Sequence, residues 1–99
     1  MMLGDKVGAE DAMKMGMIYK VVDDADLQTT AFQTAKTLSE MPTKGLGLTK
    51  RLLNKSFSNT FENQLQQEMM LQAEAGQTHD YNEGVKAFLE KRKPVFTGK

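Results

Sequence analysis

The chain has 99 residues, of which 39% are hydrophobic and 26% are charged, and its formal net charge is zero. This length suffices for one small domain, and a balanced charge gives no global field that would favour nucleic acid or a membrane surface. The chain has no cysteine, which excludes a disulfide, a thiolate metal site and a cysteine nucleophile. No apolar run is long enough to span a membrane. We expect a cytoplasmic protein.

Two short elements are predicted near the N-terminus. The segment GAEDAMKMG favours a short helix, because Glu10 and Asp11 lie in its first turn, where acids interact well with the helix dipole, and Gly16 can end it. The next segment, MIYKVV, is rich in β-branched residues and predicts a short strand. One strand cannot form a sheet alone, so this one must pair inside or outside the chain.

Two long helices are predicted next. DDADLQTTAFQTAKTLSEMP shows apolar residues at helical spacing, with Asp23 or Asp24 as the N-cap and Pro42 closing the segment. Thr43 is then predicted to cap a second helix over KGLGLTKRLLNKSF. The apolar stripe of that second helix consists of Leu46, Leu53 and Phe57, with Leu52 adjacent.

The last two helices carry a repeated capping pattern. Asn59 with Glu62, and Asp80 with Glu83, each place an acid three residues after a capping residue. Pro94 follows the final helix. The apolar positions of the first of these helices are Phe61, Leu65, Met69 and Ala73. The chain is therefore predicted to be mainly α-helical, a small orthogonal helical bundle with one short β-strand.

The residues by themselves show no self-contained active site. His79 is the only histidine and is interpreted as a solvated turn residue. No partners stand at metal-ligand spacing, and the adjacent acids Asp23 and Asp24 are typical of capping. The segment KGLGLTK lacks both the preceding strand and the spacing of a phosphate-binding loop. We expect no catalytic residue, metal or cofactor in these residues.

Three stretches together resemble one known family. They are LGDKVGAEDAMKMGMIYKVV, MPTKGLGLTKRLLN and HDYNEGVKAFLEKRKPVFTGK. In this order they are similar to the C-terminal part of the crotonase superfamily, the enoyl-CoA hydratases and isomerases of fatty acid metabolism. The ending RKPVFTGK is most similar to the ring-modifying members of phenylacetate catabolism. The resemblance spans essentially the whole chain.

The resemblance implies that two domains of the family fold have different roles, which these residues do not show by themselves. Residues 1–99 would be the C-terminal helical domain of the crotonase fold, which contacts coenzyme A and forms oligomers. The oxyanion hole and catalytic acids would belong to an N-terminal ββα spiral domain absent here, so this chain alone would be inactive. The substrate would be an acyl-CoA thioester. Family members form trimers and hexamers, and a dimer or trimer is expected for the fragment.

The resemblance also assigns two site residues. In the family, the last helix carries a Phe and a Lys, three residues apart, that reach the coenzyme A of an adjacent subunit. The matching positions are Phe88 and Lys91, which the sequence places on one side of a helix. Phe88 could instead be a core residue, since it shares a stripe with Val85 and Leu89.

Two other functions are consistent with the residues. One is a stand-alone helical interaction module that binds a partner protein through methionine-rich faces, since eight of the 99 residues are methionine. The other is an acyl-CoA-binding protein without catalysis. The sequence leaves open the acyl group and the choice between hydration and isomerisation.

Overall fold

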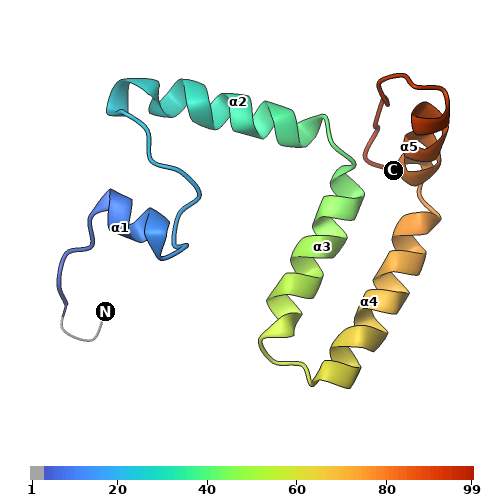
Figure 1. Cartoon of the computed structure of the whole chain (residues 1–99), viewed down its shortest axis with the longest axis horizontal. Helices are drawn as coiled ribbons and strands as arrows, with labels where there is room; N and C mark the ends of the chain where they lie inside the picture. Colours follow the sequence, from blue (N-terminus) through green and yellow to red (C-terminus); the bar gives the residue numbers. More distant parts are fainter. Residues whose placement is uncertain (1–3) are drawn as a thin grey trace. The chain divides into compact units, whose positions relative to one another are not determined.

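The computed structural model describes residues 4–99 (Figure 1). The described chain consists of two units, whose boundary along the chain lies between Thr34 and Ala35. Helices supply all the regular secondary structure of the described residues. The predicted mainly α-helical class is therefore confirmed. None of the helices in this part of the chain is long and apolar enough to cross a membrane.

The first unit contains α1, Ala9–Lys14, which ends where the sequence predicted. Gly16 has a φ of +74°. Its N–H donates to the Met13 carbonyl, and the Met17 N–H donates to the Ala12 carbonyl. This pair of bonds is a Schellman motif. Glycine suits the position because it has no Cβ to clash in left-handed backbone.

The strand predicted over residues 17–22 is wrong for the described chain. This segment is irregular and leads to a single 3-10 turn, η1, Asp24–Asp26. An isolated strand has no partner for its backbone hydrogen bonds, and residues 4–99 contain no second strand. Ile18 and Tyr19 are accordingly exposed.

The helix α2, Leu27–Ser39, follows η1 directly. Asp23 occupies the N-cap position of η1, but its side chain makes no capping hydrogen bond. The sequence predicted Asp23 or Asp24 as the N-cap of the long helix, and this is wrong, because Asp23 precedes η1 and α2 begins only at Leu27. The large apolar side chains of α2 are exposed rather than packed: Leu27, Phe32 and Leu38.

In the second unit, α3 (Thr43–Ser56) and α4 (Phe61–Gly76) pack side by side as an antiparallel hairpin (Figure 1). Leu48 is buried and Leu52 is half-buried. Their spacing of four places both on one face of α3. That face lies opposite Leu71 and Ala75 of α4, with which it lines a shallow pocket.

Two helix starts in the hairpin differ by one residue from the prediction. Pro42, rather than Thr43, is the N-cap of α3. Thr60, rather than Asn59, caps α4, and its hydroxyl accepts a hydrogen bond from the Asn63 N–H. The cap satisfies one of the four N–H groups that a helix start leaves free.

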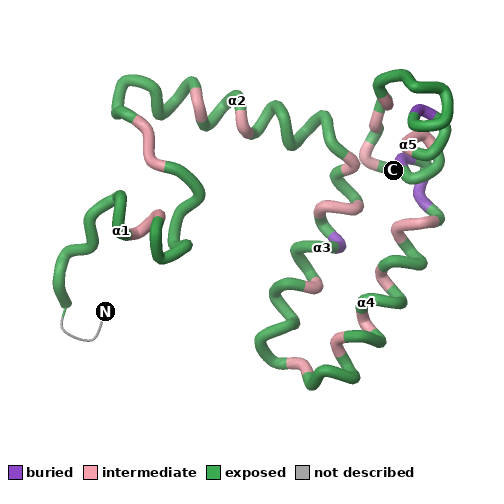
Figure 2. The backbone as a smooth tube through the Cα atoms, viewed as in Figure 1, coloured by how far each residue is buried: buried purple, intermediate pink, exposed green. Residues whose placement is uncertain are grey.

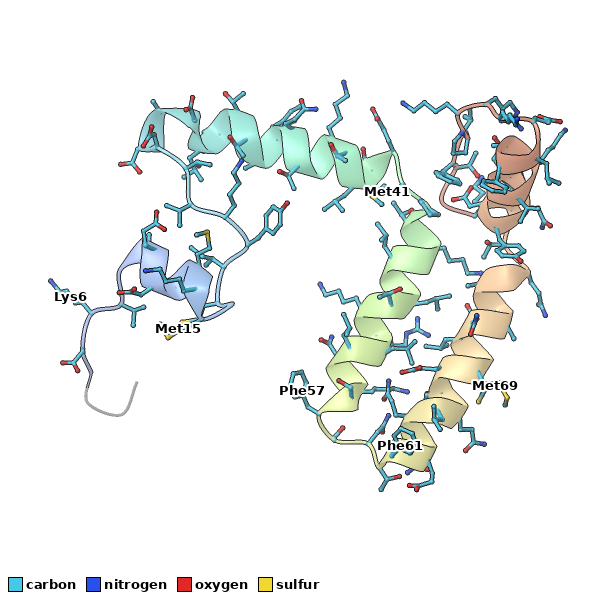
Figure 3. All side chains as sticks on the ribbon, in the orientation of Figure 1. Lys6, Met15, Met41, Phe57, Phe61 and Met69 are labelled. Carbon is cyan, nitrogen blue, oxygen red and sulfur yellow. The ribbon has the colours of Figure 1, made fainter. Side chains whose placement is uncertain are left out.

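Few apolar side chains are buried within the chain. Among residues 4–99 only Leu48 and Ala87 belong to a buried apolar core (Figure 2). The predicted stripes of α3 and α4 instead contain an exposed group at the connected end of the hairpin, called here the hairpin tip: Leu53, Phe57, Phe61 and Leu65. Figure 3 shows Phe57 and Phe61 at this end and Met69 on the side of α4 away from α3.

The helix α5, His79–Leu89, begins after a two-residue connection from α4. Thr78 is its N-cap, and the Thr78 hydroxyl accepts a hydrogen bond of 3.0 Å from the Tyr81 N–H. The predicted cap, Asp80, lies inside the first turn of the helix. The predicted capping role of Asp80 is therefore wrong.

Residues 90–99, called here the C-terminal tail, return along α5. The Asp80 N–H donates to the Lys99 carbonyl at 3.0 Å. Phe96 packs against Gly84, where an added Cβ would lie 3.7 Å from the ring. An alanine at position 84 would therefore make an ordinary van der Waals contact with this ring.

Candidate functional site

Phe88 lies in an apolar groove and not in a core. Its side chain is 82% exposed, and it lines a groove of about 450 Å³ beside α5. The other large side chains that line the groove are Pro42, Tyr81, Val85, Leu89 and Phe96. The alternative in which Phe88 is a core residue is therefore wrong for the described chain. Its ring is accessible to a flat ligand or to a second chain.

Lys91 lies just beyond the end of α5. Its φ is +54°, and within the described residues it is the one non-glycine with a positive φ. The Lys91 N–H donates to the Phe88 carbonyl, and the Arg92 N–H donates to the Ala87 carbonyl. The helix thus ends in a Schellman motif in which lysine takes the place usually held by glycine.

This ending changes the geometry expected for the pair Phe88 and Lys91. The two residues do not share a helix face, because the helical backbone stops before Lys91. The left-handed backbone costs about 1 kcal/mol relative to glycine. No carboxylate of residues 4–99 pairs with the Lys91 ammonium. The result is an unpaired cation three residues from an exposed ring.

Arg92 is neutralised by two acids, in contrast to Lys91. Its Nη1 and Nη2 donate to the Glu83 Oε1 and Oε2 at 2.6 and 2.9 Å, and its Nε donates to the Glu90 Oε2 at 2.6 Å. These contacts are called here the Arg92 bridge. The hydrogen bonds from Arg92, followed by that from the Val95 N–H, lower the pKa of Glu83 to about 2. The two acids in turn raise the pKa of Arg92.

Asp80 is a buried acid that binds the tail. It is 2% exposed, and its two carboxylate oxygens each accept a hydrogen bond of 2.7 Å, from the Thr97 N–H and the Gly98 N–H. Burial raises the pKa of Asp80, but these hydrogen bonds outweigh that effect, so its pKa is lowered. The spacing of Asp80 and Glu83 places both on one helix face, a signal that could have indicated their shared role.

The two other kinds of site considered from the sequence were a reactive histidine and a metal site. His79 is solvated as predicted, with a side chain that is 62% exposed and an Nδ1 3.3 Å from the Thr97 hydroxyl. It is the first residue of α5 and not the turn residue that the sequence suggested. Residues 4–99 contain no group of three or more side chains that could hold a metal ion. Asp80 and Glu83 are both engaged by the tail, through hydrogen bonds from Arg92, Val95, Thr97 and Gly98.

Comparisons with known proteins agree with the sequence motifs. A family model described as enoyl-CoA hydratase/isomerase matches residues 1–99. The chain is similar to the 1,2-epoxyphenylacetyl-CoA isomerase of Escherichia coli (strain K12), with 50% identity over 99% of this chain and 37% of that protein. It is also similar to the trans-2-decenoyl-(acyl-carrier-protein) isomerase of Streptococcus mutans, with 31% identity over 99% of this chain and 37% of that protein.

A solved structure leads to the same result. The crystal structure of an enoyl-CoA hydratase from Polaromonas sp. JS666 matches with a TM-score of 0.90 and 29% identity, over 97% of this chain and 37% of that one. The chain spans about 37% of the length of the curated relatives named above. The stand-alone interaction module is not favoured by these matches. Because the family model covers every residue, the chain belongs to the enoyl-CoA hydratase/isomerase family.

Proposed function

We propose that these residues are the helical part of an enoyl-CoA hydratase or isomerase, where they contact the coenzyme A of an acyl-CoA substrate and join subunits. The observation that carries the proposal is the unpaired Lys91 ammonium on a left-handed turn, three residues from the exposed ring of Phe88. Proton transfer and stabilisation of the thioester enolate are assigned to a spiral domain outside these residues.

The chemistry of coenzyme A suits these two side chains. Its nucleotide half joins a flat adenine to phosphate groups, so an aromatic ring and a point cation are complementary to it. A lysine–phosphate contact near the surface contributes about 1 kcal/mol, and an aromatic–adenine contact about 1–3 kcal/mol. The adjacent Arg92 cannot replace Lys91, because Glu83 and Glu90 already bind its guanidinium.

The test exchanges the Lys91 charge in the complete protein that carries this chain. Lys91→Glu replaces attraction with repulsion, so we expect KM for acyl-CoA to rise about tenfold, and more at low ionic strength. The kcat should change little, because the phosphates are bound alike in the ground and transition states. Lys86→Glu, in the last turn of α5, is the matched control. Equal effects of the two substitutions would reject the Lys91 contact.

A truncated substrate separates the nucleotide contact from any other role of Lys91. One relative of this chain is named for an acyl-carrier-protein substrate and another for an acyl-CoA, so the carrier itself needs a test. Acyl-pantetheine has the thioester but lacks the nucleotide. We expect Lys91→Glu to leave KM for acyl-pantetheine unchanged. A similar rise in KM for both substrates would place the effect of Lys91 outside the nucleotide.

The association role is supported by the uncovered apolar side chains. The hairpin tip and the groove beside Phe88 expose large apolar side chains that the chain does not cover, and contiguous apolar surface promotes association. We expect the 99-residue chain to sediment as a dimer or trimer at tens of micromolar. Sedimentation as a monomer at that concentration would contradict this role.

The acyl group is the most specific part of the proposal. The similarity to the 1,2-epoxyphenylacetyl-CoA isomerase, together with the RKPVFTGK ending, favours a ring-containing acyl-CoA of the phenylacetyl type. The complete protein should therefore give a higher kcat/KM with the epoxide of phenylacetyl-CoA than with crotonyl-CoA. The reverse order would assign it to straight-chain substrates.

A further inference from the structure

The Arg92 bridge encloses the turn that carries Lys91. Glu90 precedes Lys91 and Arg92 follows it, and the Arg92 Nε donates directly to the Glu90 carboxylate at 2.6 Å. The same guanidinium binds Glu83, nine residues back on α5, through two further hydrogen bonds. The residues on either side of Lys91 are thereby joined to each other and to the helix.

The tail adds a second attachment to the same acid. The Val95 N–H donates to the Glu83 Oε1 at 2.8 Å, so Glu83 accepts hydrogen bonds from both Arg92 and the tail backbone. The Glu83 side chain is only 14% exposed, whereas that of Arg92 is 37% exposed. Glu83 is thus the least solvated member of the bridge, and its loss would release the turn on one side.

The backbone at Lys91 needs such support. A lysine disfavours left-handed backbone because of its Cβ, and residues in sparsely populated conformations persist only where their surroundings determine them. The turn is supported by two backbone hydrogen bonds, by the Arg92 bridge, and by a hydrogen bond of 3.2 Å from the Arg92 Nη1 to the Lys93 carbonyl. No other non-glycine between residues 4 and 99 has a positive φ.

We propose that Glu83 and Arg92 are positioning residues for Lys91: their ion pair keeps the left-handed turn closed and so directs the Lys91 ammonium toward the phosphate of the acyl-CoA. This inference rests on the proposed function, in which the Lys91 ammonium binds a phosphate of the acyl-CoA. Neither residue contacts the substrate in this scheme. Their effect on substrate binding passes through Lys91 alone.

The test is a double-mutant cycle in the complete protein, with KM for acyl-CoA as the measurement. Glu83→Gln preserves the shape of the side chain and removes its charge, and we expect it to raise KM about threefold with kcat nearly unchanged. Lys91→Gly removes the cation and keeps the turn. In that background Glu83→Gln should change KM by less than about 1.5-fold, because the group it positions is gone.

Two variants complete the design. Glu74→Gln, which removes an acid paired with Lys44 on the α3–α4 hairpin, should leave KM unchanged in both backgrounds. Arg92→Lys keeps the charge but loses the forked hydrogen bonds, so it should reproduce Glu83→Gln and serves as the test if Glu83→Gln does not fold.

The outcomes separate the inference from the proposed function. If Lys91→Gly leaves KM unchanged, Lys91 does not contact the substrate, and both are overturned. If Lys91→Gly raises KM but Glu83→Gln and Arg92→Lys raise it by the same factor with and without Lys91, the proposed function stands. The positioning role would then be rejected, since the bridge would act through general stability.

Discussion

The α5–tail segment and the α3–α4 hairpin differ in which of their groups find partners within the chain. Along α5, Asp80 and Glu83 accept hydrogen bonds from the tail, and no buried side-chain nitrogen or oxygen of residues 4–99 lacks a partner. At the hairpin tip, Phe57 is 95% exposed and Phe61 is 74% exposed. The polar groups are satisfied internally, whereas the apolar side chains are not.

This difference indicates which contacts the chain makes by itself and which it leaves for other surfaces. A buried carboxylate without donors would be costly, and the tail supplies those donors to Asp80 from Thr97 and Gly98. An apolar side chain left in water costs less free energy than a buried carboxylate without donors. Its burial stabilises an assembly when a partner surface covers it. The tail therefore belongs to the internal structure, while the hairpin tip is available for association.

The largest effect is expected from removing the Asp80 carboxylate. Asp80→Ala leaves the Thr97 and Gly98 N–H groups without acceptors, so the thermal unfolding midpoint of the 99-residue chain should fall by roughly 5–10 °C. Asp80→Asn keeps one acceptor oxygen and should lose less. An unchanged midpoint for Asp80→Ala, with the two amides still protected from hydrogen exchange, would show that other contacts attach the tail.

Acid should weaken the same contacts without a mutation. The pKa of Glu83 falls from 4.5 to about 2 on folding, and that of Asp80 is also lowered. Each group therefore stabilises the fold fully above its unfolded pKa, and this stabilisation is lost as the pH falls through the folded pKa. The difference in unfolding free energy between wild type and Glu83→Gln should shrink between pH 4.5 and about 2 in urea titrations. A constant difference over this range would contradict the folded pKa.

Substitutions at the hairpin tip should weaken self-association and leave the fold of the chain intact. Phe57→Ser combined with Phe61→Ser should weaken self-association about tenfold, as measured by sedimentation equilibrium, because it removes exposed apolar area. Helix content should not change, since neither ring is buried within the chain. Phe32→Ser on α2 is the control, because this ring is exposed to nearly the same extent as that of Phe61. If it weakens association as strongly, the hairpin tip is not the preferred surface.

The smallest effect is expected at Lys91, where one substitution should change both the stability of the chain and the binding of substrate. Lys91→Gly should raise the unfolding free energy by about 1 kcal/mol, because glycine adopts the φ of +54° without a Cβ clash. In the complete protein the same substitution should raise KM for acyl-CoA. Lys93→Gly, outside the left-handed turn, should not stabilise. A loss of stability in Lys91→Gly would show that the Lys91 side chain stabilises the fold by more than its left-handed backbone costs.

The sequence alone predicted the elements that depend on near neighbours. Helical spacing identified the long helices α2 to α5, and Gly16 follows the end of α1 as expected. The caps were misplaced because two capping residues stood close together: Thr60 follows Asn59, and Thr78 precedes Asp80. Local propensity does not choose between such neighbours, whereas the packed start of the helix does.

The family was also readable from the sequence, because its motifs are short and lie in order along the chain. Only the tertiary structure decided the role of the acids on α5, since their donors in the tail lie 9 to 18 residues away. It alone placed Lys91 in left-handed backbone, which propensity assigns to glycine. It also removed the predicted strand, because strand formation depends on a partner and not on the β-branched residues themselves.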